Sequence, residues 1–187
     1  MSIEKVELTN IRSSLYPVPV TLVSCEDNSR TNILTISWTG ILCSSPPIIY
    51  ISIRPDRFSY DLVKQSRRFI INIPSENQLE IADKCGNCSG RDVDKFKMFN
   101  LSKEYLVKNY PPLIKECKHH LLCDVIEIKE YGTHHAFIGQ VSHEFINTDC
   151  LIDNSLDYSK INPIAYCRKD YMFLSESVAK YGQFKIK

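Results

Sequence analysis

The stretch IIYISIRPDRFSYD, residues 48–61, predicts a β-strand that runs directly into the start of a helix. Isoleucine occupies positions 49, 51 and 53 and alternates with more polar residues, which is the period of two expected of a strand. Pro55 ends the strand because proline has no N–H to donate to a sheet. Ser59 is suited to be a helix N-cap, with Asp61 in the first turn, so we expect a helix over residues 59–66.

This strand–helix junction has the composition of an anion site. The strand delivers Ser52 and Arg54 next to a helix N-terminus that carries Arg57 and Ser59. Free backbone N–H groups, the positive end of a helix dipole, hydroxyls and guanidinium groups are what a phosphate requires. The alternative is that both arginines flank a surface turn and that Ser59 is a cap without a ligand.

Length and composition indicate one domain of ordinary size, with or without a tail, that can bury a core. The formal net charge of +1 gives no general attraction to nucleic acid or to an anionic membrane. The eight cysteines lie inside apolar strands as often as in loops, which suits a reducing cytoplasm. The N-terminus has no signal-peptide core, and no apolar run approaches the roughly 20 residues that span a bilayer.

The first half of the chain alternates strands with short helices. Residues 14–25 and 31–40 predict strands joined by the turn EDNSR into a hairpin. Residues 68–74 predict another strand, after which Ser75 caps a helix to about Lys84, with Gly86 as the stop signal.

The second half is dominated by one large hairpin. Residues 87–112 predict an irregular loop with one helical turn. Residues 119–131 and 134–147 predict two long strands joined at Gly132. Short strand-like pieces at residues 162–166 and 171–174 precede a polar tail. Many antiparallel strands and few helices favour a closed or partly closed β-barrel.

Three further features allow a functional interpretation and a structural one. The pair Cys85–Cys88 could bind zinc, but a second CxxC is absent. It could also act as a redox pair, but the C-terminal end of a helix disfavours a thiolate. We therefore prefer chance spacing of the two cysteines. Two pairs of histidines, at residues 119–120 and 134–135, lie on adjacent predicted strands and could meet. We favour surface or interface histidines over a metal site. Trp38 either packs in a core or interface, or lines a flat aromatic ligand. No nucleophile–base spacing, dinucleotide fingerprint or P-loop is present.

Four segments together resemble the flavin reductase-like, FMN-binding split-barrel family that includes the flavoredoxins. They are YPVPVTLVSC (16–25), TNILTISWTG (31–40), SIRPDRFSYDLVKQSRRFIINIP (52–74) and CGNCSGRDVDKF (85–96). The resemblance implies a mainly β fold, a Greek-key antiparallel split β-barrel with a few short helices, formed by residues 1–187 as a single FMN-binding domain.

The resemblance also implies the site. The FMN phosphate would be held by the turn of Ser52 to Tyr60, the ring system would lie along residues 32–38, and the loop of residues 89–95 would close over it. Hydroxyls of Thr35 and Ser37 are suited to the polar edge of the ring. The predicted cofactor-binding residues are Asn32, Thr35, Ile36, Ser37, Trp38, Ser52, Arg54, Arg57, Ser59, Tyr60, Ser89 and Lys95. No catalytic residue and no metal ligand is predicted.

The expected activity is that of a cytoplasmic, FMN-dependent oxidoreductase, a homodimer that takes electrons from NAD(P)H. A flavoredoxin-type carrier reduced by a partner protein is the first alternative, and a flavin-binding module without turnover is the second. In each case the cofactor carries the chemistry, which explains why a catalytic triad is not needed.

Overall fold

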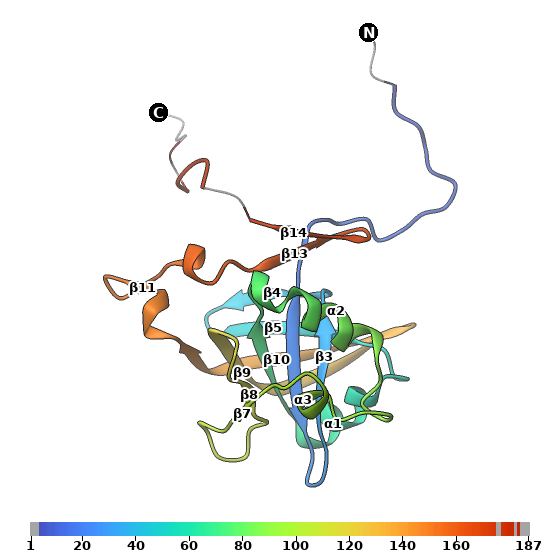
Figure 1. Cartoon of the computed structure of the whole chain (residues 1–187). Helices are drawn as coiled ribbons and strands as arrows, with labels where there is room; N and C mark the ends of the chain where they lie inside the picture. The colour runs from blue at the N-terminus through green and yellow to red at the C-terminus, as the bar shows by residue number, and fades with distance from the viewer. Residues whose placement is uncertain (1–3, 175–176, 182, 184–187) are drawn as a thin grey trace.

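A seven-stranded antiparallel sheet forms the body of the computed structural model, which describes residues 4–174, 177–181 and 183 (Figure 1). Its strand order is β3-β2-β6-β9-β10-β5-β4. The strands are β2 (Thr21–Glu26), β3 (Thr31–Ile36), β4 (Thr39–Ser44), β5 (Pro47–Ile53), β6 (Arg68–Ile73), β9 (His119–Tyr131) and β10 (His134–Ile146). The sheet curls round an apolar interior, so the predicted mainly β architecture is confirmed.

Shorter elements surround this sheet. The strand β1 (Val18–Pro19) joins β13 (Ile164–Cys167) and β14 (Asp170–Phe173) in a second sheet. The remaining elements are β7 (Lys103–Glu104), β8 (Leu113–Ile114), β11 (Leu151–Ile152), β12 (Ser155–Leu156), α1 (Phe58–Ser66), α2 (Leu79–Asn87), α3 (Lys95–Met98), η1 (Glu76–Gln78), η2 (Thr148–Cys150) and η3 (Tyr158–Lys160). The predicted polar tail extends into residues 175–176, 182 and 184–187, which lie outside the described residues.

Both faces of the β2–β3 hairpin are buried. On the inner face, Val23 and Ile36 belong to the core of the barrel. On the outer face, Leu22 and Ile33 pack against Ala82 of α2 within a second apolar cluster. The hairpin is therefore fixed from two sides, which holds β3 in one position against the rest of the molecule.

Two predicted strands are each divided in the structure. Residues 14–25 form β1 and β2, because β1 pairs with β13 whereas β2 pairs with β3 and β6. Residues 31–40 form β3 and the beginning of β4, with Trp38 in the break between them. Thr39 pairs with Ile51 of β5, whereas β3 pairs with β2, so the chain leaves the first hairpin between β3 and β4.

Two predicted helix boundaries are wrong. The helix α1 begins at Phe58 with Arg57 as its N-cap, and Ser59 is a fully buried residue of the first turn. The helix α2 continues through Gly86, because the N–H of Cys88 still donates to the carbonyl of Lys84. Gly86 lies within α2 and faces Thr35 of β3, where an added Cβ would make an ordinary contact at 3.4 Å, so this glycine is not a stop signal.

The β9–β10 hairpin also corrects the interpretation of the histidines. In its register His134 lies opposite Tyr131, whereas His119 lies opposite Ile146. The two histidine pairs are thus at opposite ends of the hairpin and do not meet. His119 and His120 are buried, which contradicts their prediction as surface or interface residues.

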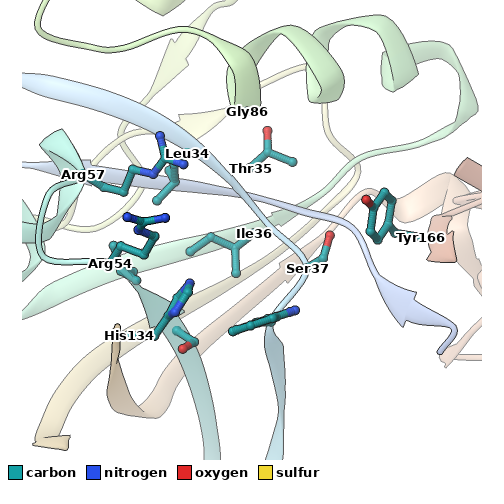
Figure 2. Close-up of a pocket in the computed structure, with 12 residues that line it drawn as sticks. Leu34, Thr35, Ile36, Ser37, Arg54, Arg57, Gly86, His134 and Tyr166 are labelled. Atoms are coloured by element: carbon teal, nitrogen blue, oxygen red, sulfur yellow. The ribbon is translucent and has the colours of Figure 1, made fainter. Parts of the chain in front are cut away.

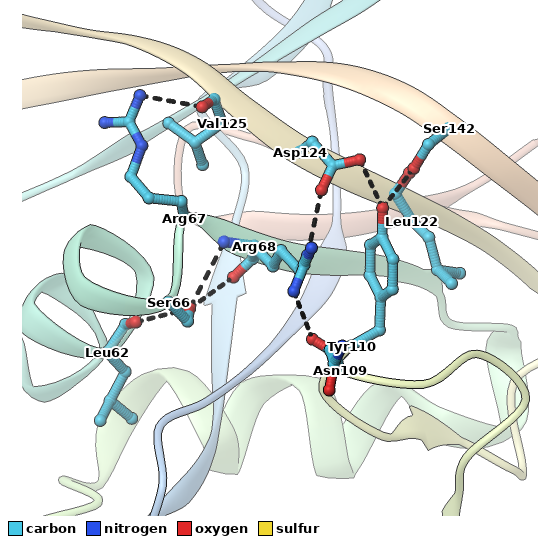
Figure 3. Close-up of polar contacts among 10 residues, drawn as sticks. All are labelled: Leu62, Ser66, Arg67, Arg68, Asn109, Tyr110, Leu122, Asp124, Val125 and Ser142. Carbon is cyan, nitrogen blue, oxygen red and sulfur yellow. Dashed lines mark hydrogen bonds and ion pairs between the residues drawn. The ribbon is translucent and has the colours of Figure 1, made fainter.

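A polar network holds the long loop of residues 99–118 against the barrel (Figure 3). The side chain of Arg68 donates to Asp124 Oδ1 at 3.1 Å and to the carbonyl of Asn109 at 3.0 Å. The hydroxyl of Tyr110 lies 2.5 Å from both Asp124 Oδ2 and Ser142 Oγ. Among the described residues, no helix has the length and apolar character needed to cross a membrane.

Candidate functional site

A cavity of about 400 Å³ opens between β3, the turn after β5 and the start of β10 (Figure 2). Its lining residues are Leu34, Thr35, Ile36, Ser37, Trp38, Ser52, Ile53, Arg54, Arg57, Gly86, His134 and Tyr166. The structure therefore brings together Thr35, Ile36, Ser37, Trp38, Ser52, Arg54 and Arg57 from the predicted set.

The cavity is positively charged at one end. Arg54, Arg57 and His134 all line the cavity, and Figure 2 shows the two arginines on the same side of it. Arg54 pairs with Asp56 at 3.2 Å, and both side chains are largely exposed. Arg57 forms no ion pair with any other described residue and lies at the N-terminus of α1. Two guanidinium groups and a helix dipole at one point favour an anion.

The floor of the cavity is the edge of β3. Residues 34–38 all line it, although side chains of a strand alternate between faces. Consecutive lining residues mean that the edge of the strand, with its backbone groups, faces the cavity. Among the strands of the described residues, β3 is terminal in the sheet and pairs only with β2, so its outer edge has no partner strand there. This edge can bind a ligand that has its own hydrogen-bond donors and acceptors.

An aromatic pair forms the wall near this edge. The rings of Trp38 and His134 have centroids 4.5 Å apart and planes inclined by 40°. Burial, and then the charge of Arg54, lower the pKa of His134. His134 is not among the predicted site residues, because its position depends on the pairing of β10 with β5.

Five predicted residues do not line the cavity: Asn32, Ser59, Tyr60, Ser89 and Lys95. Asn32 and Ser59 are buried, and the amide of Asn32 donates to the hydroxyl of Ser59 at 2.8 Å. The hydroxyl of Tyr60 lies 2.8 Å from Nδ1 of His135. These side chains support the two segments that carry the cavity, the β5–α1 turn and β10.

Lys95 is buried and acts on the backbone of the site. Its ammonium group donates to the carbonyls of Ile33 at 2.8 Å and Cys85 at 2.6 Å. Burial lowers its pKa. The two bonds connect β3 to the end of α2, so Lys95 positions the strand edge that forms the floor.

The loop of residues 89–95 packs on the turn between β5 and α1 and contributes no residue to the lining of the cavity. The side chain of Arg91 donates to the carbonyl of Asp56 at 3.0 Å. A Cβ on Gly90 would lie only 2.3 Å from Oδ1 of Asn32, so the backbone of the loop approaches this side chain closely. The loop thus braces the turn, and its closure over a bound cofactor stays a prediction.

The cysteine pair lies beside the site at the end of α2, as predicted. Cys85 is buried, and this burial raises the pKa of its thiol to about 12. Cys88 is the C-cap of the helix. Across the described part of the chain, no three His, Cys, Asp or Glu side chains are grouped as metal ligands would be.

Comparison with known proteins gives a consistent result. The model of the flavin reductase like domain matches residues 12–175. The flavoredoxin of Desulfovibrio vulgaris (Miyazaki F) is similar over 96% of this chain and 99% of its own, with 29% identity and a TM-score of 0.89. An FMN-binding protein from Thermus thermophilus shares the fold at 22% identity, with a TM-score of 0.78 over 96% of this chain and 98% of its own. The reductase component of a 4-nitrophenol monooxygenase from Rhodococcus opacus is 25% identical over 74% of this chain and 71% of its own.

Proposed function

Because this chain belongs to the flavin reductase like domain family, we propose that it is an FMN-binding oxidoreductase that takes electrons from NAD(P)H. The observation that carries the proposal is the composition of the cavity: paired arginines at one end, a free strand edge along its floor and an aromatic wall beside it. An FMN-binding protein among the similar structures supports the choice of cofactor.

The donor set fits FMN part by part. Arg54 and Arg57 would hold the phosphate, with the N-terminus of α1 adding its dipole. The edge of β3 would bond the polar edge of the ring system. The hydroxyl of Thr35 already donates to the carbonyl of Ala82 at 2.5 Å, so Thr35 can only accept from the cofactor, whereas Ser37 remains able to donate. When bound, FMN supplies the ability to accept a hydride from a reduced nicotinamide and to pass the electrons on.

The side chains of this site bind, orient and exclude water, and none is required to move a proton. Burial and the charge of Arg54 lower the pKa of His134, and its flat ring lies beside that of Trp38. These two rings can support a planar ligand.

A second candidate function is that of an electron carrier reduced by a partner protein. It is favoured by the similarity to a flavoredoxin, which extends over 99% of that chain. A flavin-binding module without turnover is a third possibility. The test is anaerobic addition of NADH or NADPH to the FMN-loaded protein, followed at the visible flavin band. Rapid bleaching supports the reductase, bleaching only with an added redox protein supports the carrier, and a protein that binds no FMN refutes all three.

We also propose a cytoplasmic homodimer whose subunits meet beside the cavity. The edge strand β4 exposes Ile41 at 79% and Leu42 at 54%, and Trp38 next to it is 46% exposed. Apolar side chains gathered at a sheet edge favour association with another chain. All eight cysteines are free thiols, which suits a reducing compartment.

A further inference from the structure

The two cysteines of the motif CGNC stand at the end of α2, beside the cavity. Cys85 is buried, Cys88 is partly exposed, and both are free thiols. Gly86 lies between them and lines the cavity. The proposed function uses neither thiol, so the pair is a separate chemical feature of this helix end.

The backbone holds the two cysteines within the span of a disulfide. Residues 85–87 are helical, and the N–H of Cys88 still donates to the carbonyl of Lys84 at 3.1 Å, so the Cα of Cys88 keeps the position that the helix gives it. Residues three apart in an α-helix have Cα atoms about 5 Å apart, inside the range of about 4.4–6.8 Å that disulfides adopt. Their side chains lie on one face of the helix, and their Cβ atoms need to approach by about 1–2 Å. Cys88 has φ −119° and ψ 157°, so it has already left the helical conformation and can make this movement.

Lys95 changes the electrostatics of this helix end. A thiolate is disfavoured at the C-terminus of a helix, because the last carbonyl groups carry the negative end of the dipole. The buried ammonium group of Lys95 bonds one of these carbonyls, that of Cys85, at 2.6 Å. Burial lowers the pKa of Lys95, whereas the nearby thiols of Cys88 and Cys85 raise it. A cation at this point offsets the dipole, and a thiol beside a lysine is a better nucleophile.

The two thiols differ in their access to solvent. Burial raises the pKa of the Cys85 thiol to about 12, so this thiol stays protonated and shielded. Cys88 is therefore the member of the pair that a dissolved oxidant reaches first. Cys43 and Cys167 are also partly exposed, but the residue opposite each of them in its strand pair is not a cysteine.

We propose that Cys85 and Cys88 form a reversible oxidation site, which a hydroperoxide converts from a dithiol to a disulfide. Cys88 is the thiol that is attacked, and Cys85 is the thiol that resolves the product. The site needs no bound flavin, so it goes beyond the proposed function and can be tested separately from it.

The chemistry balances with hydrogen peroxide as the oxidant. The Cys88 sulfur attacks one peroxide oxygen, so that an S–O bond forms, the O–O bond breaks, and the other oxygen leaves as water with the proton of the thiol. The Cys85 sulfur then attacks the Cys88 sulfur, so that the S–S bond forms, the S–O bond breaks, and the hydroxyl leaves as a second water with the proton of Cys85. The pair of thiols loses two electrons, and one peroxide is reduced to two waters.

The test treats the reduced full-length chain with hydrogen peroxide, blocks the remaining thiols with iodoacetamide in denaturant, and records the intact mass and the peptide map. We expect the wild type to lose two alkylated thiols and to form a Cys85–Cys88 cross-link that dithiothreitol reverses. In Cys88→Ser this loss should vanish. In Cys85→Ala the oxidised Cys88 has no resolving thiol, so it should keep one oxygen atom as a sulfenic acid that dimedone traps. Cys167→Ser is the matched control, because it removes a partly exposed thiol elsewhere and should form the cross-link as the wild type does.

Three results would overturn the proposal. The wild type could keep both thiols at a peroxide concentration that fully oxidises free glutathione, Cys88 could accumulate as a sulfinic acid without a cross-link, or Cys88→Ser could still lose a pair of thiols. The FMN content of the preparation is measured separately. A chain that forms the cross-link but binds no FMN would end the proposed function and leave the oxidation site in place.

Discussion

Removal of Arg54 tests the anion end of the cavity most directly. Its guanidinium group lines the cavity and lies 3.2 Å from Asp56. A hydrogen bond to a charged group contributes about 1.5–3 kcal/mol to binding. Because the side chain of Arg54 is about half exposed, the lower figure applies to the loss of its bond to the phosphate. In Arg54→Ala the carboxylate of Asp56 also loses its partner and remains near the phosphate, which adds repulsion. The expected weakening of FMN binding is therefore about tenfold to 150-fold.

The assay is a titration of the apoprotein with FMN and with riboflavin, followed by quenching of flavin fluorescence. Riboflavin lacks the phosphate, so its binding should be almost unchanged in Arg54→Ala. Arg91→Ala is the matched control, because Arg91 bonds the same turn through the carbonyl of Asp56 but does not line the cavity. Its effect should stay within about twofold, as for most surface substitutions. Equal weakening for both ligands, or none for FMN, would refute the assignment of the phosphate to this turn.

Three further predictions concern stability and assembly. Gly90→Ala should lower the stability by about 1–3 kcal/mol, measured by urea unfolding, because the new Cβ would meet Oδ1 of Asn32 at 2.3 Å; an unchanged midpoint would contradict this packing. Burial lowers the pKa of His120 to about 4, so as the pH falls the imidazole is protonated in the unfolded chain before it is protonated in the folded protein. The free energy of unfolding should therefore fall by about 3 kcal/mol between pH 6.5 and 4. This loss should be absent in a His120→Asn variant that still folds. Ile41→Glu should convert the proposed dimer to a monomer in light scattering, and a monomeric wild type would end the proposal.

The parts of the site that follow from local sequence are those that could be predicted. The alternation of residues 48–54 and the proline after them belong to one segment. They place Ser52, Arg54 and Arg57 together at one end of the cavity. Strand periodicity likewise identifies β9 and β10 almost to the residue. These features need no knowledge of which strand lies beside which.

The residues that sequence reasoning missed depend on pairing between distant strands. His134 reaches the cavity because β10 lies beside β5, and Tyr166 reaches it because β13 pairs with β1. The family resemblance predicts Lys95 in a loop over the site, and its burial could not be read from the sequence because charged side chains are rarely buried. Its burial becomes favourable only when the backbone carbonyls of Ile33 and Cys85 come close enough to accept hydrogen bonds from its ammonium group.

The position of the cavity follows from how the sheet closes. β3 and β4 are consecutive in the chain but stand at opposite ends of the strand order, so residues 37–38 must cross the seam of the barrel. At this seam the outer edge of β3 has no neighbouring strand, and Trp38 keeps contact with β5 through its carbonyl, which accepts from the N–H of Ser52 at 2.9 Å. An unpaired edge is costly when it is shielded from water, unless another molecule supplies donors and acceptors. A flat ring with a polar edge would satisfy this requirement, and the arginines in the turn after β5 would fix the direction in which it enters.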